Sequence, residues 1–373
     1  AWALDARTGR QIWRYRRQLP EGLNICCGRV NRGFAIRGDR LYMTTLDAHL
    51  VALDARTGNV LFDVEIDDHT KSYTATVAPL IVKDKVIVGI AGAEYGIRGF
   101  IDAFDANTGR KAWRFWTVPE SGQPGANTWQ GDGWRRGGGS TWVTGAYDPS
   151  LNLVYWGTGN PSPDSFGDAR PGDNLYTDSV VALDVDTGTL RWHYQFTPHD
   201  VHDWDAVQVP ILADLTINGA PRKVLMTANR NGFFYTLDRT NGALLRARPF
   251  VKTTWAQEVG QDGKPILLEA NKIGTEGTVT CPDVGGGTNW MSPSFNPTTG
   301  LFYVTTREVC AKFYAFPQEF LPGHLYWGGA VENIPGEPGF GALRAIDPVS
   351  GLVRWEFKYP KPSFGGTLST ASG

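Results

Sequence analysis

The sequence has little cysteine, almost no charge imbalance and no long hydrophobic run. Its 36 Lys and Arg face 38 Asp and Glu, which gives a net charge of -2. Because no broad basic surface is available to gather phosphates, nucleic acid is disfavoured as a partner. No apolar run reaches the roughly 18 residues that a membrane-spanning helix needs, since charges interrupt stretches such as LIVKDKVIVGIAG. A membrane span within this chain is therefore excluded.

An initiating methionine and a secretory signal are also lacking, since the chain begins at Ala1 inside a strand-like pattern and stops at Gly373 without a tail. We expect a single domain over residues 1–373 that is incomplete at both ends. The missing signal sequence carries no information about the compartment.

Glycine, proline and aromatic residues are abundant by contrast. The 373 residues include 45 Gly, 23 Pro and 12% aromatic residues, within an ordinary globular composition of 41% hydrophobic and 20% charged residues. Such a composition favours many short strands joined by tight turns over long helices. We predict an all-β fold.

One pattern repeats along the chain: an apolar residue and Asp, two residues, Thr-Gly, three residues and an aromatic. Clear copies are ALDARTGRQIW, ALDARTGNVLF, AFDANTGRKAW, ALDVDTGTLRW and AIDPVSGLVRW, and a weaker copy is TLDRTNGALLR. Each copy predicts a strand, a turn that Asp and Gly stabilise, and a second strand that starts near the aromatic. The chain is therefore expected to be built of repeated units.

The spacing of the copies indicates the size of the unit. They start at Ala3, Ala52, Ala103, Ala182, Thr236 and Ala345, at intervals of 49, 51, 79, 54 and 109 residues. A period of about 50 residues is that of one four-stranded propeller blade. We expect the interval of 79 to contain an inserted hairpin near a ligand site, and the interval of 109 to span two periods with one degenerate copy between. The motif tryptophans are expected to pack blade on blade, without a catalytic role: Trp13, Trp113, Trp192 and Trp355.

Two adjacent cysteines, Cys26 and Cys27, depart from the repeat. Neighbouring Cα atoms lie about 3.8 Å apart, which is closer than ordinary disulfides prefer. The other cysteines are Cys281 and Cys310, and four cysteines allow three pairings. Free buried thiols and all three pairings stay open at this point.

A glycine-rich run, GGGSTW, ends at Trp142 inside the long insertion. Glycines allow the backbone to approach a flat ligand closely, and Trp142 offers a face for stacking. The alternative is a flexible loop with a surface tryptophan.

Hard oxygen donors occur in three separate blades, at Glu94, at Asn160, and at Asp203 with Asp205. Carboxylate and amide oxygens suit Ca²⁺ or a similar hard cation. Local capping of turns is the alternative for each donor taken alone. A zinc site built on His199 and His202 would be weak, because no thiol ligand is near them in the sequence.

Taken together, these features resemble the methanol and ethanol dehydrogenases that depend on pyrroloquinoline quinone (PQQ). The matching pieces occur in the family's order, as Cys-Cys with Val-Asn-Arg-Gly, Gly-Ala-Glu, Gly-Gly-Gly-Ser-Thr-Trp, Gly-Asn-Pro, and His-Asp with Trp-Asp. The resemblance runs from Ala1 to about Gly373. It implies an eight-bladed β-propeller of four-stranded blades, of which about six are present in this chain.

The resemblance also implies how PQQ is held. Cys26 and Cys27 would form a disulfide on one face of the quinone, Trp142 would stack on the other, and Cys281 would pair with Cys310. Both disulfides need an oxidising compartment, for which we expect the periplasm. Further contacts to the quinone are expected from side chains suited to its carboxylates and ring oxygens: Arg32, Thr76, Ser140, Asn289 and, beside the reactive carbonyl, Arg230.

For the metal ion, Glu94 and Asn160 match the family's ligands, and Asp203 matches its catalytic base. Asp205 resembles the added aspartate of the lanthanide-dependent branch. Residues two apart on a strand point the same way, so of Asp203 and Asp205 one carboxylate can bind metal while the other takes a proton. The next residues, Ala-Val-Gln, depart from that branch, so both Ca²⁺ and a lanthanide ion stay open. Two more departures from the family pattern fall at Ala91 and Phe364, where many members carry serine and tryptophan.

The activity implied is oxidation of a primary or secondary alcohol to the aldehyde or ketone. Asp203 would act as general base, the metal ion as Lewis acid on the quinone carbonyl, and a cytochrome c as electron acceptor. One alternative is a quinoprotein for a bulkier or polymeric alcohol or a sugar, and another is a non-catalytic propeller that binds proteins. The sequence leaves the oligomeric state open, with a homodimer as one option.

Overall fold

The computed structural model describes residues 1–371, which form short antiparallel strands joined by loops. Helix occurs in this part of the chain only as short 3-10 turns, namely η1 (His69–Lys71), η2 (Ala93–Tyr95), η3 (Ala126–Thr128), η4 (Gly133–Arg136), η5 (Gly167–Ala169) and η6 (Glu269–Asn271). None of the helical segments described is long and apolar enough to cross a bilayer. The all-β prediction is confirmed.

Five four-stranded antiparallel sheets make up the frame of the described residues. The first two are β3 (Ala35–Arg37), β4 (Arg40–Thr45), β5 (His49–Asp54) and β6 (Val60–Glu65), then β7 (Leu80–Val82), β8 (Lys85–Gly89), β9 (Phe100–Asp105) and β10 (Lys111–Trp116). The next two are β11 (Ala146–Asp148), β12 (Leu153–Gly157), β13 (Ser179–Asp184) and β14 (Leu190–Gln195), then β15 (Ile211–Ile217), β16 (Ala220–Ala228), β17 (Phe233–Asp238) and β18 (Leu244–Pro249). The fifth is β22 (Ser294–Asn296), β23 (Leu301–Glu308), β26 (Phe340–Ile346) and β27 (Val353–Tyr359).

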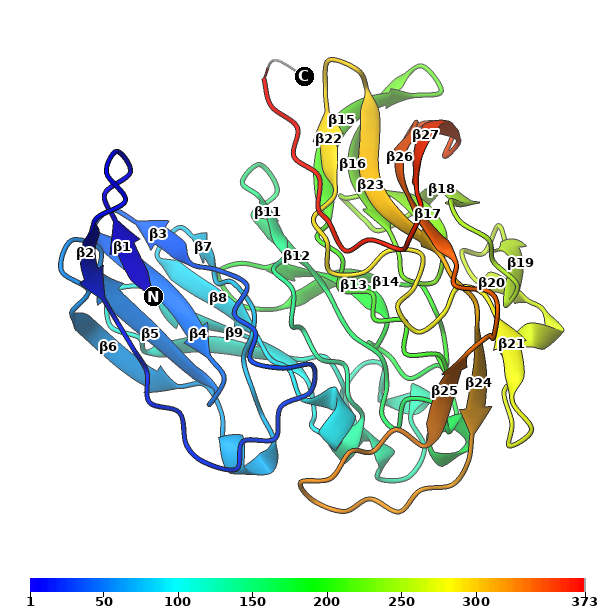
Figure 1. Ribbon diagram of the computed structural model, residues 1–373, viewed down its shortest axis with the longest axis horizontal. Helices are drawn as coiled ribbons and strands as arrows, with labels where there is room; N and C mark the ends of the chain where they lie inside the picture. Colours follow the sequence, from blue (N-terminus) through cyan, green and yellow to red (C-terminus); the bar gives the residue numbers. More distant parts are fainter. Residues whose placement is uncertain (372–373) are drawn as a thin grey trace.

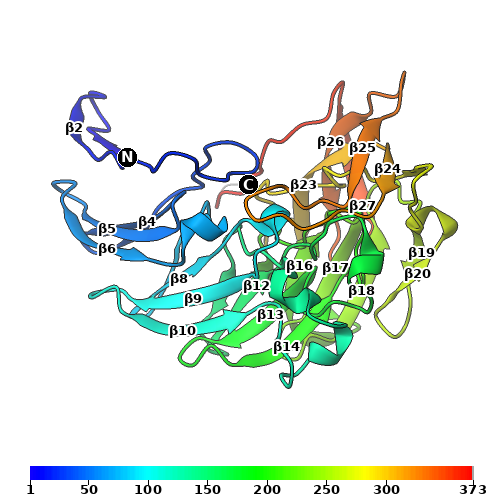
Figure 2. The same ribbon diagram turned by 90° about the horizontal axis from the view of Figure 1, so that it is seen from below.

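Three smaller sheets complete the strands of residues 1–371. A hairpin of β1 (Trp2–Leu4) and β2 (Gln11–Arg14) precedes the first large sheet. The other two are the hairpin β19 (Ala256–Val259) with β20 (Pro265–Leu267), and the sheet of β21 (Thr278–Thr280), β24 (Ala311–Ala315) and β25 (Gly329–Asn333). In Figures 1 and 2 the large sheets follow one another in chain order around an arc, from the blue sheet through green to the red one.

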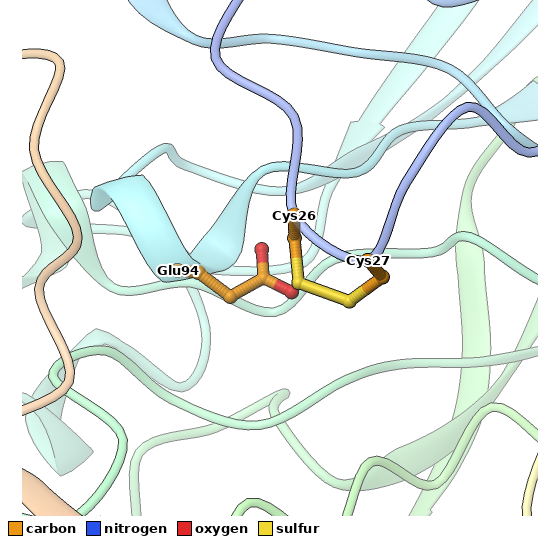
Figure 3. A group of neighbouring side chains, drawn as sticks. All are labelled: Cys26, Cys27 and Glu94. Carbon is orange, nitrogen blue, oxygen red and sulfur yellow. A yellow bond between two sulfur atoms is a disulfide. The ribbon is translucent and has the colours of Figure 1, made fainter.

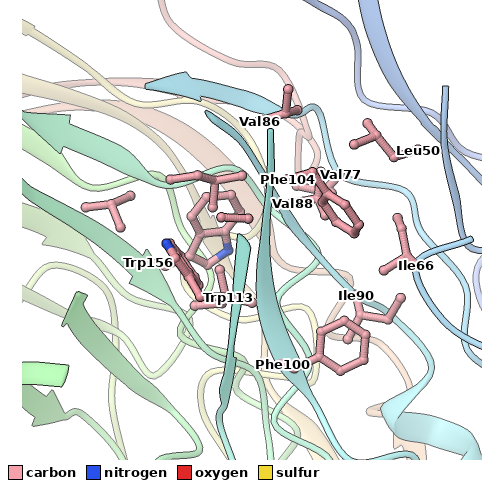
Figure 4. Packing of buried hydrophobic residues seen from close by; sticks show 14 of the residues in the cluster. Leu50, Ile66, Val77, Val86, Val88, Ile90, Phe100, Phe104, Trp113 and Trp156 are labelled. Carbon is pink, nitrogen blue, oxygen red and sulfur yellow. The ribbon is translucent and has the colours of Figure 1, made fainter. Parts of the chain in front are cut away.

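Neighbouring sheets pack face to face, and the hydrophobic core lies between them. The first cluster lies between the sheets β3–β6 and β7–β10 and continues to the sheet β11–β14. The second joins that sheet to β15–β18, and the third joins β15–β18 to the fifth sheet. Figure 4 shows the first cluster, with Leu50 and Ile66 on one side of Val88 and with Trp113 beside Trp156. A layer of apolar side chains therefore holds each sheet to the next.

The repeated motif supplies the contact between sheets. The indole Nε1 of Trp113, on β10, donates to the carbonyl oxygen of Val185 in the following sheet across 2.8 Å. The ring of Trp113 packs on Gly188, where an added Cβ would lie 2.6 Å from the indole. Trp13 and Trp192 make equivalent bonds to the next turn, to the carbonyl oxygens of Ala55 and Arg239. The architectural role predicted for these three tryptophans is thus confirmed.

Trp355 differs from the other motif tryptophans. Its side chain is 44% exposed, whereas Trp13, Trp113 and Trp192 are 8–9% exposed. Within residues 1–371 no turn packs on it in the way that the turn at Gly188 packs on Trp113.

The interval of 109 residues contains one sheet with insertions, so the expected degenerate copy between two periods is wrong. Phe234 of β17 packs on Phe302 of β23 with 5.0 Å between the ring centroids, which makes their two sheets direct neighbours. The extra residues form β19–β20 and the sheet of β21, β24 and β25. They carry no copy of the Asp-Thr-Gly turn, which is the feature that packs each sheet on the tryptophan before it.

The interval of 79 residues does not contain the expected inserted hairpin either. The added chain lies in the connections 117–145 and 158–178, which contain η3, η4 and η5 but no strand. Glycine and proline are frequent in both connections, and neither residue suits a strand interior. These two connections nevertheless carry site residues, as expected for an insertion near a ligand site.

Candidate functional site

A cavity of about 1220 Å³ opens among the loops of the sheets. Every site residue predicted from the sequence except Asn160 lines it, and Asn160 is bonded to two residues that do. The predicted residues that line the cavity are Cys26, Cys27, Arg32, Thr76, Glu94, Ser140, Trp142, Asp203, Asp205, Arg230 and Asn289. The chain therefore brings together the residues that the resemblance selected, from seven separate segments.

The topology of the sheets explains this convergence. Links between the second and third strands of a sheet carry Glu94, Asn160 and Arg230. Links from one sheet to the next carry the other predicted residues, among them Trp142 and Asp203. In an antiparallel meander both kinds of link lie at the same end of the sheet, so successive sheets present them around one space.

Two disulfides are present, as the resemblance implied. Cys26 pairs with Cys27, with 3.8 Å between their Cα atoms, and Cys281 pairs with Cys310. The Cys26–Cys27 disulfide faces the carboxylate of Glu94, and its two Sγ atoms and a carboxylate oxygen lie within 4.8 Å of one another (Figure 3). Because the sulfurs are bonded to each other, neither is a thiolate that could bind a metal ion.

Trp142 and Arg32 contact each other inside the cavity. The guanidinium carbon of Arg32 lies 4.4 Å from the centre of the Trp142 ring, and its Nη1 donates to Thr76 Oγ1 across 2.5 Å. Burial lowers the pKa of Arg32 to about 10, although nearby Asp205 opposes this shift. A planar group stacked on the same face of Trp142 would have to move this guanidinium aside.

Arg230, Asp203 and Asp205 form the charged centre of the cavity. Arg230 donates from Nη1 to Asp205 Oδ2 across 2.6 Å and from Nη2 to Asp203 Oδ2 across 3.3 Å. Asp205 also accepts bonds from the indole Nε1 of Trp142 and the backbone N–H of Asn160. The Asp203 side chain is 30% exposed toward the cavity, whereas that of Asp205 is 8% exposed. Asp203 therefore has the more accessible carboxylate.

Burial governs the ionisation of this centre. It raises the pKa of Asp203 well above the usual range, and the negative charges of Asp205 and Glu94 add to the shift while Arg230 opposes it. Burial also raises the pKa of Asp205, again against Arg230. For Glu94, burial followed by the charge of Asp205 raises the pKa to about 7. Each carboxylate would ionise more readily with a cation beside it.

The backbone beside Asp205 is fitted closely to it. An added Cβ at Gly159 would lie 2.2 Å from Asp205 Oδ1 and 2.7 Å from Ser140 Oγ. Glycine at this position therefore allows Asp205 to approach the Asn160 backbone. Asp203 adopts a left-handed φ of 59° on the other side of the centre.

Histidine does not form a zinc site here. His199 lies in a separate shallow depression of about 360 Å³ with Asp168 and Asp173, where its Nδ1 contacts the carbonyl oxygen of Gly172. His202 lines the main cavity, stacks on Trp204 with 4.2 Å between ring centroids, and is 1% exposed. Neither ring nitrogen of His202 has a hydrogen-bond partner among the described residues.

Sequence reasoning missed Asp164, a buried carboxylate at the inner wall of the cavity. Its position four residues after Asn160, in Pro-Ser-Pro-Asp, marks another hard oxygen donor and could have identified it. It also missed the apolar wall of Trp290, Trp327 and Val331, because Trp327 and Val331 come from the insertion that carries β25.

The two positions that depart from the family pattern occupy different places. Ala91 lines the cavity directly. Phe364 stacks on Trp290, with 6.3 Å between ring centroids, and so supports a residue of the wall.

Comparison with known proteins assigns the chain to a class. A family model for PQQ proteins, described as Glucose/ethanol/alcohol dehydrogenase, beta-propeller domain, matches residues 1–249. The fold is thus that of a PQQ-type β-propeller. The chain belongs to the PQQ-dependent alcohol dehydrogenase family.

Named relatives give the extent of this similarity. Quinohemoprotein alcohol dehydrogenase ADH IIB of Pseudomonas putida is 46% identical over 391 residues, which cover 99% of this chain and 56% of that protein. A lanthanide-dependent methanol dehydrogenase of Methylacidiphilum fumariolicum is 38% identical over 373 residues, covering 93% of this chain and 61% of that protein. The solved structure of a europium-containing methanol dehydrogenase has a TM-score of 0.94 and 36% identity, and it covers 100% of this chain and 70% of that one. The chain thus spans little more than half the length of the first relatives it matches.

Proposed function

We propose that this protein uses PQQ and a metal ion to oxidise a primary or secondary alcohol to the aldehyde or ketone. One observation carries the proposal. The Cys26–Cys27 disulfide, Trp142 and the carboxylates of Glu94, Asp203 and Asp205 line a single cavity of about 1220 Å³. Membership of the PQQ-dependent alcohol dehydrogenase family supports the same reaction.

The residues present fit both the quinone and the ion. When bound, the quinone would supply the electrophilic carbonyl that accepts the carbinol hydrogen with its electron pair, and the metal ion would polarise that carbonyl. The ion would be held by hard oxygen donors, namely Glu94, Asn160, Asp203 and Asp205. The disulfide and Trp142 would contact the quinone faces once the Arg32 guanidinium moves off the Trp142 ring, and the polar edge of the quinone would meet Arg32, Thr76, Ser140 and Asn289.

Asp203 is the proposed general base, which takes the proton of the alcohol hydroxyl. Its carboxylate is the more exposed of the central aspartates, and Arg230 holds it at 3.3 Å without enclosing it. A cation bound among Glu94 and Asp205 would favour the ionised form that a base needs. Arg230 would keep that carboxylate oriented and would carry the positive charge that faces the reacting oxygen.

The partners and setting of the enzyme are part of the proposal. Electrons would pass to a cytochrome c, which the word quinohemoprotein in the names of relatives supports. Two disulfides support an oxidising compartment, for which we propose the periplasm. A homodimer stays an option.

We also propose that residues 1–373 belong to one propeller domain that extends beyond them, since Trp355 is exposed where other motif tryptophans are covered.

Titration with PQQ tests the proposal. The protein, expressed from its complete gene, is mixed with PQQ and with Ca²⁺ or La³⁺, and cofactor absorbance and alcohol-dependent dye reduction are followed. Uptake of PQQ with turnover that depends on alcohol and metal supports the proposed function. Absence of PQQ uptake with either ion would favour a non-catalytic propeller, and turnover confined to sugars or polymeric alcohols would favour the bulkier substrate.

A further inference from the structure

Asp164 is a carboxylate of the cavity that none of the roles above uses. It lines the cavity wall and is 5% exposed. No Lys, Arg or His of residues 1–371 forms an ion pair with it. Arg170 lies near enough to interact electrostatically with Asp164, but its guanidinium donates to the backbone carbonyl oxygens of Pro163, Asp164 and Asp200 and not to the Asp164 carboxylate.

The partner of this carboxylate is Asn160, a proposed metal ligand. Asn160 Nδ2 donates to Asp164 Oδ1 across 2.9 Å and to the carbonyl oxygen of Pro161 across 3.1 Å. Both amide hydrogens are thereby used, and no donor of the described residues contacts Asn160 Oδ1. An ionised carboxylate, which a cation bound nearby favours, accepts hydrogen bonds and does not donate them, so Asp164 then prevents the amide from turning its oxygen the other way. Asp164 thus holds Asn160 with its ligand oxygen free.

Asp164 also adds to the negative charge around the proposed ion site. It lines the same cavity as Asp203 and Glu94. Arg230 forms its ion pairs with Asp203 and Asp205, and neither Glu94 nor Asp164 is paired with it.

We propose that Asp164 is a positioning residue of the metal site that fixes the amide of Asn160 and, as an additional carboxylate, makes the site select a trivalent lanthanide ion over Ca²⁺. The inference rests on the proposed function. The four carboxylates that line the cavity outnumber its two guanidinium groups, Arg32 and Arg230, so each added carboxylate favours the ion of higher charge. Attraction between charges grows with the charge of the ion, and it is strong where water is excluded.

Metal affinity tests this inference without relying on turnover. Tb³⁺ is titrated into the PQQ-loaded protein while its luminescence is excited through tryptophan, and Ca²⁺ affinity is measured by calorimetry. Asp164→Asn keeps an oxygen that can accept the Asn160 bond but removes the charge. It is expected to lower Tb³⁺ affinity by about tenfold or more and Ca²⁺ affinity by less. Asp164→Ala removes the bond as well and is expected to weaken both ions by about 10–100-fold.

Asp168→Asn is the matched control, because it removes the same charge from an exposed position of the same loop outside the main cavity. It is expected to leave both affinities unchanged. Melting curves of the metal-free variants check that each one folds. If Asp164→Asn folds and keeps the parent's ratio of Tb³⁺ to Ca²⁺ affinity, the inference fails while the proposed function stands. If the parent takes up neither PQQ nor Tb³⁺, the proposed function and the inference fail together.

Discussion

Arg230 and Asp205 form a buried ion pair, with 2.6 Å between Nη1 and Oδ2. Asp205 accepts two further bonds, from Trp142 and from the Asn160 backbone, so its carboxylate is held on three sides. Asp203 has a longer contact of 3.3 Å to the same guanidinium and faces the cavity. Of the two aspartates that the sequence could not separate, Asp205 is therefore the fixed one and Asp203 the accessible one.

Asp203→Asn should remove turnover while leaving PQQ uptake in place. An asparagine of the same shape keeps the contact with Arg230 but cannot accept the hydroxyl proton, so kcat is expected to fall by about 10²–10⁴-fold. Steady-state dye reduction and the absorbance of bound PQQ measure the two properties separately. Equal kcat values for the variant and the parent would exclude Asp203 as the base.

Loss of the Arg230 cation should destabilise the protein strongly. Arg230→Met leaves Asp205 buried without its partner, which is expected to cost about 3–5 kcal/mol of unfolding free energy. Lys83→Met is the matched control, because it removes the cation of an ion pair with Asp186 in which both side chains are about half exposed. The control is expected to change stability by about 1 kcal/mol or less. Urea unfolding of the metal-free proteins gives both values, and a small effect at Arg230 would contradict the importance of this pair.

Much of the fold could be predicted from the sequence because its repeat encodes a contact as well as a local shape. The Asp and Gly of each copy form a turn, and the tryptophan of the preceding copy packs on that turn, as Trp113 does on Gly188. The site residues could be selected by resemblance, and their convergence follows from links that lie at one end of each sheet.

Other features depend on contacts that the spacing of motifs does not encode. Arg170 holds the loop that carries Asp164 in place, because its guanidinium donates to the backbone carbonyl oxygens of both Asp164 and Asp200. Asp200 lies 30 positions after Arg170 in the sequence. The stacking of Arg32 on Trp142 joins residues from different sheet connections. The interval of 109 residues looked like two periods because length alone does not distinguish a blade from an insertion.

The contact between Trp113 and Gly188 should be sensitive to a single methyl group. In Gly188→Ala the added Cβ would lie 2.6 Å from the Trp113 ring at a residue with φ of 72°, so both collision and backbone strain oppose it. Gly9→Ala separates these effects, because Gly9 has a similar φ of 70° but nothing within 4 Å of the added atom. Gly188→Ala is expected to be less stable than Gly9→Ala by about 1–3 kcal/mol in urea unfolding. Equal values would mean that the turn moves freely away from the tryptophan.

The stabilisation that a cation gives should increase with pH because of Glu94. Burial raises the pKa of Glu94 from 4.5 to about 7, so between these values the folded protein keeps a proton that the unfolded chain has lost. In the absence of metal, this proton makes the unfolding free energy fall with rising pH, by about 1.4 kcal/mol per pH unit. A bound cation needs the ionised carboxylate and displaces the proton. La³⁺ should therefore raise the melting temperature more at pH 7.5 than at pH 5, roughly on either side of the raised pKa of Glu94.

Two variants test whether Glu94 is the source of this effect. Glu94→Gln has no such proton and should lose this part of the pH dependence, whereas the exposed Glu337→Gln should keep it. An unchanged pH dependence in Glu94→Gln would assign the effect to the neighbouring aspartates, whose pKa values burial also raises.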